Sequence, residues 1–167
     1  NYTLNLSGDN IPSGFLTNAL TEMNYVTNQS QMGDSGTVAI EMMGLDFTPV
    51  VTGSAYDASL HTNLPGNPIV TGTASETGTI PPTPDGSIAV NQENTKLFSF
   101  DYTHADANDF NFVNLAFQGL QSLTQIVLAA TIPDGKKLKV EVKDKDGRVA
   151  DFLLVGDGTK HNYTLNF

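Results

Sequence analysis

The chain has 167 residues, which is enough for one sizeable β domain or for a small domain with an ordered extension. Its net charge of −10 argues against nucleic acid as a partner, because binding to phosphates requires clustered Lys and Arg. Cysteine is absent, which excludes disulfides and thiol chemistry, and no apolar run approaches the ~20 residues of a membrane span.

The N-terminal part is predicted to contain three short strands. Tyr2, Leu4 and Leu6 alternate with polar residues, which is the period-two pattern of a half-buried strand. After this strand we expect, in chain order, a loop over 7–14, a helical turn over 15–22, a strand over 23–28, a loop over 29–36 and a strand over 37–42.

Residues 46–91 have a different composition, rich in Pro, Thr and Gly. Six of the eight prolines lie there, and no helical period is visible. Because proline restricts the backbone, we expect an extended, semi-rigid connector. A segment of this length is unusual inside a compact domain, and only 47–51 and 68–70 have a strand-like pattern.

The C-terminal part is dense in strand patterns. Strands are predicted over 97–102, 110–117, 124–130, 138–143, 148–155 and 163–165. The apolar run over 124–130 is typical of a central strand buried on both faces, and Asp146-Gly147 between two alternating strands predicts a β-hairpin. The chain is therefore predicted to be all-β, with eight or nine strands in a β-sandwich or jelly roll and an extended Pro/Thr/Gly-rich connector.

The two ends of the sequence carry the same strand-like word. Residues 1–5 and 162–166 both read NYTLN, and the sixth pair, Leu6 and Phe167, is apolar in both copies. Besides chance, three explanations are open. In the first, the chain is one repeat of a tandem array with a period near 161 residues. In the second, separate chains donate their N-terminal strands to a neighbour's incomplete sheet. In the third, the domain closes on itself, as a circular permutant does.

The first two explanations divide the chain into three parts. Residues 1–45 would be the closing strands of a jelly roll in the neighbouring unit, 46–91 the connector, and 92–167 the opening strands of the next jelly roll. The N- and C-terminal parts of one chain would then not complete the same sandwich. The candidate assembly residues are the alternating apolar residues of the two words: Tyr2, Leu4, Leu6, Tyr163, Leu165 and Phe167.

Read in permuted order, five segments of the chain resemble the galactose-binding-like jelly rolls. These segments are FSFDY, LKVEVKDKDGRVADFLL, HNYTLN, GDNIPSGF and GTVAIE. Such modules occur as carbohydrate-binding modules and as tandem repeats in bacterial extracellular proteins, so the resemblance implies an extracellular or cell-surface location. The low charged fraction of 16% is typical of the same location.

The segment DYTHADANDF is rich in oxygen ligands. Asp101, Asp106 and Asp109 have the density that suits Ca²⁺, although their spacing is not that of an EF-hand loop. The resemblance adds Glu41, because galactose-binding-like jelly rolls often hold a structural Ca²⁺ near their first and last strands. A solvated acidic loop is the alternative interpretation.

Carbohydrate binding is the second function that the resemblance implies. Tyr25, Tyr56 and Tyr102 are the candidate residues, since aromatic rings stack on sugar faces. Trp, the usual platform for sugars, is absent, and Tyr in an alternating strand is also typical of a core.

The charges are distributed unevenly along the chain. Residues 1–95 contain nine acids and no Lys or Arg, whereas seven of the eight basic residues lie between Lys136 and Lys160. Either these charges are simply solvated, or the acidic part of one copy contacts the Lys-rich part of the next copy.

No catalytic motif is complete in this sequence. Gly33-Asp34-Ser35-Gly36 has the letters of the nucleophile loop of chymotrypsin-like proteases, but all three histidines follow Ser35, whereas that family needs its His and Asp before the Ser. The histidines lack metal-ligand spacing and are expected at the surface. We therefore expect no enzymatic activity.

Together these patterns predict a structural repeat or subunit of an extracellular filament or surface array. Copies of the chain would be joined head-to-tail, by β-strand complementation or by tandem covalent linkage. The alternative is a carbohydrate-binding module of a secreted multidomain protein, with a polysaccharide as its partner.

Overall fold

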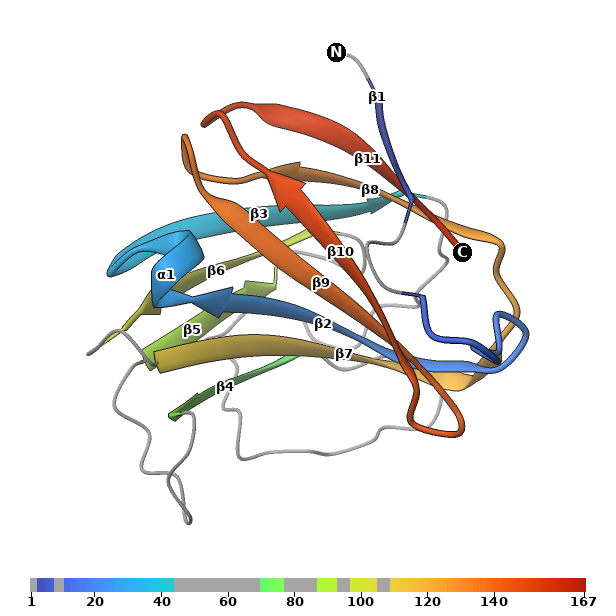
Figure 1. The fold of residues 1–167 in the computed structure, drawn as a ribbon. Coiled ribbons are helices and arrows are strands. Elements are labelled where there is room, and N and C mark those ends of the chain that lie inside the picture. Colours follow the sequence, from blue (N-terminus) through green and yellow to red (C-terminus); the bar gives the residue numbers. More distant parts are fainter. Residues whose placement is uncertain (1–2, 8–10, 44–69, 77–86, 93–96, 105–108) are drawn as a thin grey trace.

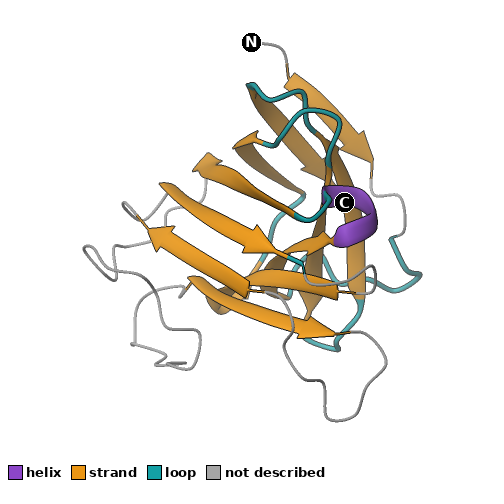
Figure 2. Ribbon diagram, turned by 90° about the vertical axis from the view of Figure 1, so that its left-hand side faces the viewer, coloured by secondary structure: helices purple, strands orange, loops and turns teal. Residues whose placement is uncertain are grey.

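Two β-sheets packed face to face form the protein (Figure 1). The structure is a computed structural model that describes residues 3–7, 11–43, 70–76, 87–92, 97–104 and 109–167. Most of the described residues lie in strands, with the short helix α1 (Gln29–Met32) as an exception (Figure 2). The predicted all-β sandwich is therefore confirmed. No helix in the described ranges has the length and apolarity needed to cross a membrane.

Six strands of the described ranges form the first sheet, and its border strand β1 runs parallel to its neighbour. Its order is β1 (Thr3–Ser7), β11 (Lys160–Asn166), β8 (Gln125–Thr131), β3 (Ser35–Met43), β6 (Leu97–Thr103) and β5 (Ser87–Gln92). Neighbouring strands are antiparallel except β1 and β11, which run parallel.

The second sheet contains five of the described strands, and all of their pairings are antiparallel. Its order is β10 (Val149–Val155), β9 (Lys137–Asp144), β2 (Leu20–Asn28), β7 (Asp109–Gln121) and β4 (Val70–Glu76). The chain crosses from the second sheet to the first through α1, which joins β2 to β3.

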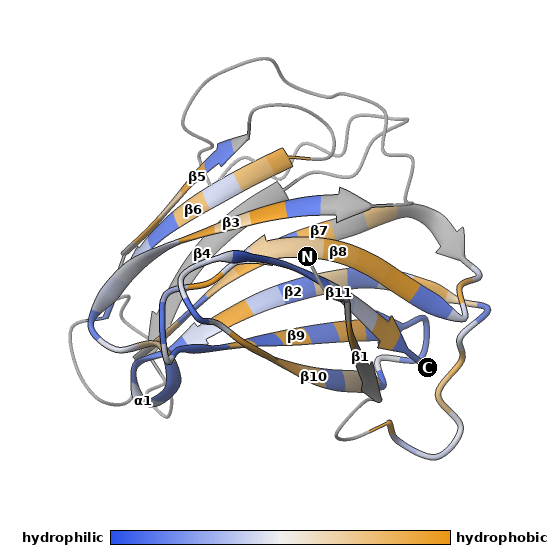
Figure 3. Ribbon diagram, turned by 90° about the horizontal axis from the view of Figure 1, so that it is seen from above, coloured by the Kyte–Doolittle hydropathy of each residue, from blue (hydrophilic) through white to orange (hydrophobic). Residues whose placement is uncertain are grey.

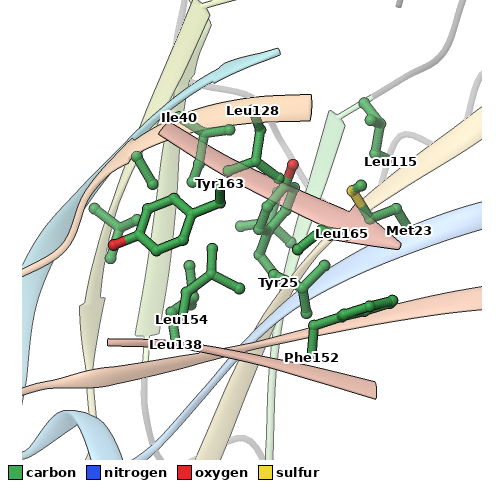
Figure 4. Close-up of a cluster of buried hydrophobic side chains, with 14 of the residues drawn as sticks. Met23, Tyr25, Ile40, Leu115, Leu128, Leu138, Phe152, Leu154, Tyr163 and Leu165 are labelled. Carbon is green, nitrogen blue, oxygen red and sulfur yellow. The ribbon is translucent and has the colours of Figure 1, made fainter. Parts of the chain in front are cut away.

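Alternation in the sequence decides which face of each strand is buried. In β9, Leu138, Val140 and Val142 are fully buried, while Lys139 and Glu141 between them are half-buried and face outward. Figure 3 shows hydrophobic and hydrophilic residues alternating along β9. The inward side chains of both sheets meet in one core (Figure 4). Because burying a large apolar side chain contributes about 1.5–3 kcal/mol, this core is the main source of stability.

The helical turn predicted over 15–22 is wrong. Residues 11–19 form a loop, and β2 begins at Leu20. Leu20 and Met23 fit a helical period, but β2 lies between β9 and β7 and pairs with both, so tertiary pairing overrides the local pattern.

The loop predicted over 29–36 contains α1. Asn28 is the N-cap residue of this helix, and its side chain accepts a hydrogen bond from the backbone N–H of Gln31 at 2.9 Å. The sequence therefore holds a helix-start signal that a turn-based interpretation of the segment overlooked.

The segment predicted as a connector contains two strands. Within 46–91, β4 pairs with β7 at one border of the second sheet, and β5 pairs with β6 at one border of the first sheet. Both strands are rich in small and polar residues, because a border strand has one neighbour and needs few apolar contacts. The strand-like pattern over 47–51 lies outside the described residues.

The N-terminal strands complete the same sandwich as the C-terminal ones. β2 lies between β9 and β7, and β3 lies between β8 and β6. The structure therefore differs from the expectation that 1–45 complete a neighbouring unit, and it corresponds to the self-closed arrangement. The physical reason is that Met23, Tyr25 and Ile40 fill the core formed by the C-terminal strands.

Gly156, which follows β10, leaves no room for a side chain. A Cβ atom at this position would lie 2.5 Å from the carbonyl oxygen of Ile132 and 2.6 Å from its Cβ. We expect Gly156→Ala to lower the free energy of unfolding by about 1–3 kcal/mol, the usual effect of overpacking. Urea denaturation measures this change, and a loss below about 0.5 kcal/mol, as at an open surface site, would contradict the close approach.

Candidate assembly edge

β1 is attached to the sandwich along one side. Within the described part of the chain it pairs with β11 alone, with Leu4 opposite Tyr163 and Leu6 opposite Leu165. Figure 1 shows β1 alongside β11 at the border of the first sheet. The described residues of the first NYTLN word, Thr3–Asn5, thus lie beside the second word in space. This border is the candidate assembly edge.

The two words are paired with an offset of two residues. In the sequence Leu4 corresponds to Leu165, but in the sheet Leu4 lies opposite Tyr163. An offset of two keeps every side chain on the same face of the sheet, because side chains alternate with period two. Leu4 is accordingly half-buried and packs against the core. Tyr2 and the side chain of Leu6 lie outside the described residues.

β11 is held more firmly than β1. Tyr163 and Leu165 are fully buried, and the Tyr163 hydroxyl donates a hydrogen bond to the Val155 carbonyl of the opposite sheet at 2.8 Å. Phe167 stacks on Phe15 with ring centroids 5.6 Å apart and meets the ring of Phe152 edge-on at the same distance. β11 therefore belongs to the core, and β1 is an addition to its outer side.

The loop that follows β1 is fixed to the body of the sandwich. The backbone N–H of Leu16 donates to the Asp144 carboxylate at 3.0 Å. Leu123 N–H donates to the Thr17 carbonyl at 2.9 Å, and Lys145 N–H donates to the Ala19 carbonyl at 2.8 Å. The chain is therefore anchored from about Phe15 onward, which separates β1 from the anchored part.

Asp144 is the buried carboxylate of this anchor. It accepts backbone hydrogen bonds from Leu16, Asp146 and Arg148 at 2.9–3.0 Å and is 3.2 Å from the Arg148 guanidinium. Burial alone would raise the pKa of Asp144, but the hydrogen bonds from Arg148, Leu16 and Asp146 outweigh it and lower that pKa. Asp144 is thus ionised at neutral pH and ties the loop to the β9–β10 hairpin. In the sequence, Asp144 has only the pattern of a turn residue.

Acids of the N-terminal part pair with bases of the C-terminal part inside one chain. Glu22 lies 2.6 Å from Lys143, and Glu41 is ion-paired with Lys160. Both pairs are partly exposed, so each contributes at most about 1 kcal/mol. At these two places, acids of the N-terminal part therefore form ion pairs with bases of the C-terminal part of the same chain.

The predicted calcium ligands do not gather in the described part of the chain. Asp101 accepts a hydrogen bond from Thr37 of β3, and Glu41 lies four residues farther along β3, so the two acids are about 13 Å apart. Asp106 and the side chain of Asp109 lie outside the described residues. No three acidic or histidine side chains of the described ranges form a group that could hold a metal ion, and calcium remains a prediction.

Two of the three candidate carbohydrate residues are buried. Tyr25 is 0% exposed and Tyr102 is 1% exposed. The Tyr102 hydroxyl donates to the Met32 carbonyl at 2.9 Å, and burial raises the pKa of both phenols. Neither ring can stack on a sugar, so the interpretation of Tyr25 and Tyr102 as platforms is wrong. Tyr56 lies outside the described residues.

Two of the three histidines are also buried, against the expectation of surface positions. His104 and His161 are each 8% exposed. His104 lies 2.6 Å from the Gly33 carbonyl through Nδ1 and 3.2 Å from the Thr27 hydroxyl through Nε2. His161 lies 2.8 Å from the Asp157 carboxylate. These contacts are internal cross-links near strand ends, and sequence spacing gave no sign of them. His61 lies outside the described residues.

No protein-family model, curated protein or solved structure matches this chain.

Proposed function

We propose that the protein is a structural subunit of an extracellular filament or surface array, whose copies are joined by β-strand complementation. The β1 strand of one copy pairs with β11 of the next. The observation that carries the proposal is the parallel pairing of β1 with β11 at a sheet border, between two strands that share one five-residue word.

An edge strand such as β1 is suited to exchange because it has one hydrogen-bonded neighbour among the described strands. Its release leaves the other ten strands of the described ranges, β11 included, in place. The free edge of β11 then presents unpaired backbone N–H and C=O groups. The β1 strand of another copy can pair with these groups in the same register. The internal and the exchanged pairing use the same contacts, so concentration decides between them.

The exchanged segment is shorter than the sequence suggested. β2 and β3 lie inside the two sheets, and the loop from Phe15 onward is anchored through Asp144. Release is therefore confined to the residues before this loop. Donation of β1 from one copy to the next is a head-to-tail contact, and such contacts propagate into filaments when they do not close into rings.

Cysteine pairing tests the exchange, because the chain has no cysteine of its own. Thr3 and Asn162 are register partners, and paired residues of neighbouring strands lie about 5 Å apart, within the reach of a disulfide. We expect a mixture of the single variants Thr3→Cys and Asn162→Cys to form disulfide-linked heterodimers at high concentration. Non-reducing electrophoresis of the mixture measures them.

A matched control pairs Thr3→Cys with Ser99→Cys. Ser99 lies on β6, which is separated from β1 by three strands of the same sheet. Cross-linking of the Asn162 mixture that does not exceed that of the Ser99 mixture, together with complete intrachain linkage in the Thr3→Cys/Asn162→Cys double variant, would show a closed monomer. In addition, deletion of residues 1–7 should abolish assembly into species larger than a dimer, while the circular dichroism spectrum keeps its β character.

A further inference from the structure

β10 is a border strand whose outer side is unoccupied in the described part of the chain. It pairs with β9 along Val149–Val155, and no described strand pairs with its other side. Figure 3 shows β10 along the border of the second sheet. Such a border presents backbone N–H and C=O groups to any strand that approaches it.

The phase of the β9–β10 ladder identifies the groups that face outward. Asp144 N–H donates to the Arg148 carbonyl, so Asp144 and Arg148 are a bonded pair. In an antiparallel ladder bonded and non-bonded pairs alternate. The N–H and C=O groups of Val149, Asp151 and Leu153 therefore point away from β9. The Val155 carbonyl also points away from β9, and it accepts a hydrogen bond from the hydroxyl of Tyr163 in the other sheet.

β10 lacks the usual protection of a border strand. Its sequence, VADFLLV, contains no Lys, Pro or Gly, and Asp151 is its only charge. Val155 is 51% exposed, the most exposed large apolar side chain of the described ranges. One carboxylate oxygen of Asp151 is buried and has no hydrogen-bond partner there. An apolar border without these protective residues is a surface that another strand can cover.

The strand is complementary to itself when a two-fold axis passes through its centre at Phe152. With a two-fold axis at Phe152, two antiparallel copies of β10 place Val149 opposite Val155 and Asp151 opposite Leu153. Every outward-facing residue then meets an outward-facing residue, so the outward N–H and C=O groups of Val149, Asp151 and Leu153 face partners, whereas the Val155 carbonyl already accepts from Tyr163. An axis at Asp151 would place two carboxylates opposite each other, which is unfavourable.

We infer that two copies of this chain associate through antiparallel β10–β10 pairing, which joins their second sheets into one continuous sheet. The contact is isologous and therefore closed, in contrast to the head-to-tail exchange of β1. It uses the border of the other sheet and does not depend on the proposed function.

A proline at position 153 tests the contact. The Leu153 N–H points away from β9, so Leu153→Pro removes an outward donor in each copy and leaves the β9–β10 ladder intact. We expect the dissociation constant of the dimer to rise at least about tenfold, because two intermolecular hydrogen bonds are lost. Leu153→Ala, which keeps the N–H, should change it by no more than about threefold. Sedimentation equilibrium on the full chain measures both.

A charge pair tests the register and remains informative if the proline variant does not fold. Because Val149 lies opposite Val155 of the other copy, Val155→Glu alone should weaken the dimer, and Val149→Lys/Val155→Glu should restore it. The two positions are about 20 Å apart within one strand, so only an intermolecular contact allows this rescue. A folded Leu153→Pro variant that associates like the wild type, or a double variant without rescue, would each overturn the inference. The Thr3–Asn162 cross-linking remains unaffected in both cases.

Discussion

Replacing Tyr163 with alanine is expected to lower the free energy of unfolding by about 3–5 kcal/mol, the range for removing a large aromatic side chain from a core. Tyr163 is 1% exposed and is among the largest fully buried side chains of the described residues. Figure 4 shows it among Leu138, Leu154 and Ile40, side chains from both sheets. The substitution leaves a cavity between the sheets at the strand that carries the candidate assembly edge.

Tyr163→Phe is the matched control, because it keeps the ring and removes the hydroxyl that donates to the Val155 carbonyl. We expect this variant to lose about 1 kcal/mol, the net contribution of one hydrogen bond. Urea denaturation followed by circular dichroism measures both variants. An alanine variant within about 1 kcal/mol of the wild type would show that β11 is not a core strand, and the assembly edge would then have no rigid support.

Replacing Asp144 with alanine is the second large effect that we expect, a loss of about 2–3 kcal/mol at pH 7. Three backbone N–H groups, those of Leu16, Asp146 and Arg148, would lose a charged acceptor. Hydrogen bonds to a charged group contribute more than neutral ones, and donors left unsatisfied near a core are costly. The Leu16 loop is expected to become more mobile, which hydrogen exchange of the Leu16 amide would detect.

The effect of Asp144 depends on pH with a definite sign. Its pKa is lowered from the ordinary 3.8 by folding, so its contribution is complete above that value and is lost as the pH falls through the lower folded value. Asp157 acts in the same direction, since hydrogen bonds from Thr159 and His161 lower the pKa of Asp157 to about 2. The wild type should therefore lose stability between about pH 4 and pH 2.

Asp144→Asn isolates the contribution of the charge. At pH 7 this variant should be less stable than the wild type, and the difference should shrink as the pH approaches 2. Urea denaturation at pH 7, 4 and 2.5 measures the change. A difference that stays constant over this range would mean that Asp144 acts through packing and not through its charge.

The strands with clear alternation were predictable. The residues that form β6 and β9 alternate between apolar and polar, and the Asp146-Gly147 turn appears as expected, with Gly147 at φ +80°. β8 is a central strand, as its apolar run indicated. These predictions succeeded because the period of a strand depends on burial of one or both faces, which the sequence records directly.

The pairing partners were not predictable. Alternation assigns a face to a strand but not a neighbour, so it could not place β2 between β9 and β7 or make β1 parallel to β11. In β7, the same pattern did not reveal that Phe110 and Phe112 lie half-buried, with their rings stacked on each other 6.4 Å apart and outside the core cluster. How deeply a face of a strand is buried depends on its neighbours in the sheet and on the opposite sheet, which are distant in the sequence.

The candidate site was only partly predictable for the same reason. The repeated word identified Tyr163 and Leu165, which are core residues of the assembly edge. It could not identify Asp144, because the segment KDKDGR reads as a solvated turn, and the burial of its first aspartate depends on Leu16, 128 residues away. Nor could composition distinguish β4 and β5 from a connector, since β4 consists mostly of Thr, Gly, Ala and Ser, and the apolar run of β5 is only three residues long.

The interleaving of early and late strands has a consequence for synthesis. β2 and β3 are made first, but each fits between two strands from the second half of the chain, and β2 has its full set of neighbours only when Asp144 has been made. Chains lengthen at about 5–20 residues per second, so the N-terminal strands wait several seconds without partners. The nascent chain is therefore expected to leave the ribosome unfolded, to need protection by a holdase, and to fold slowly once complete.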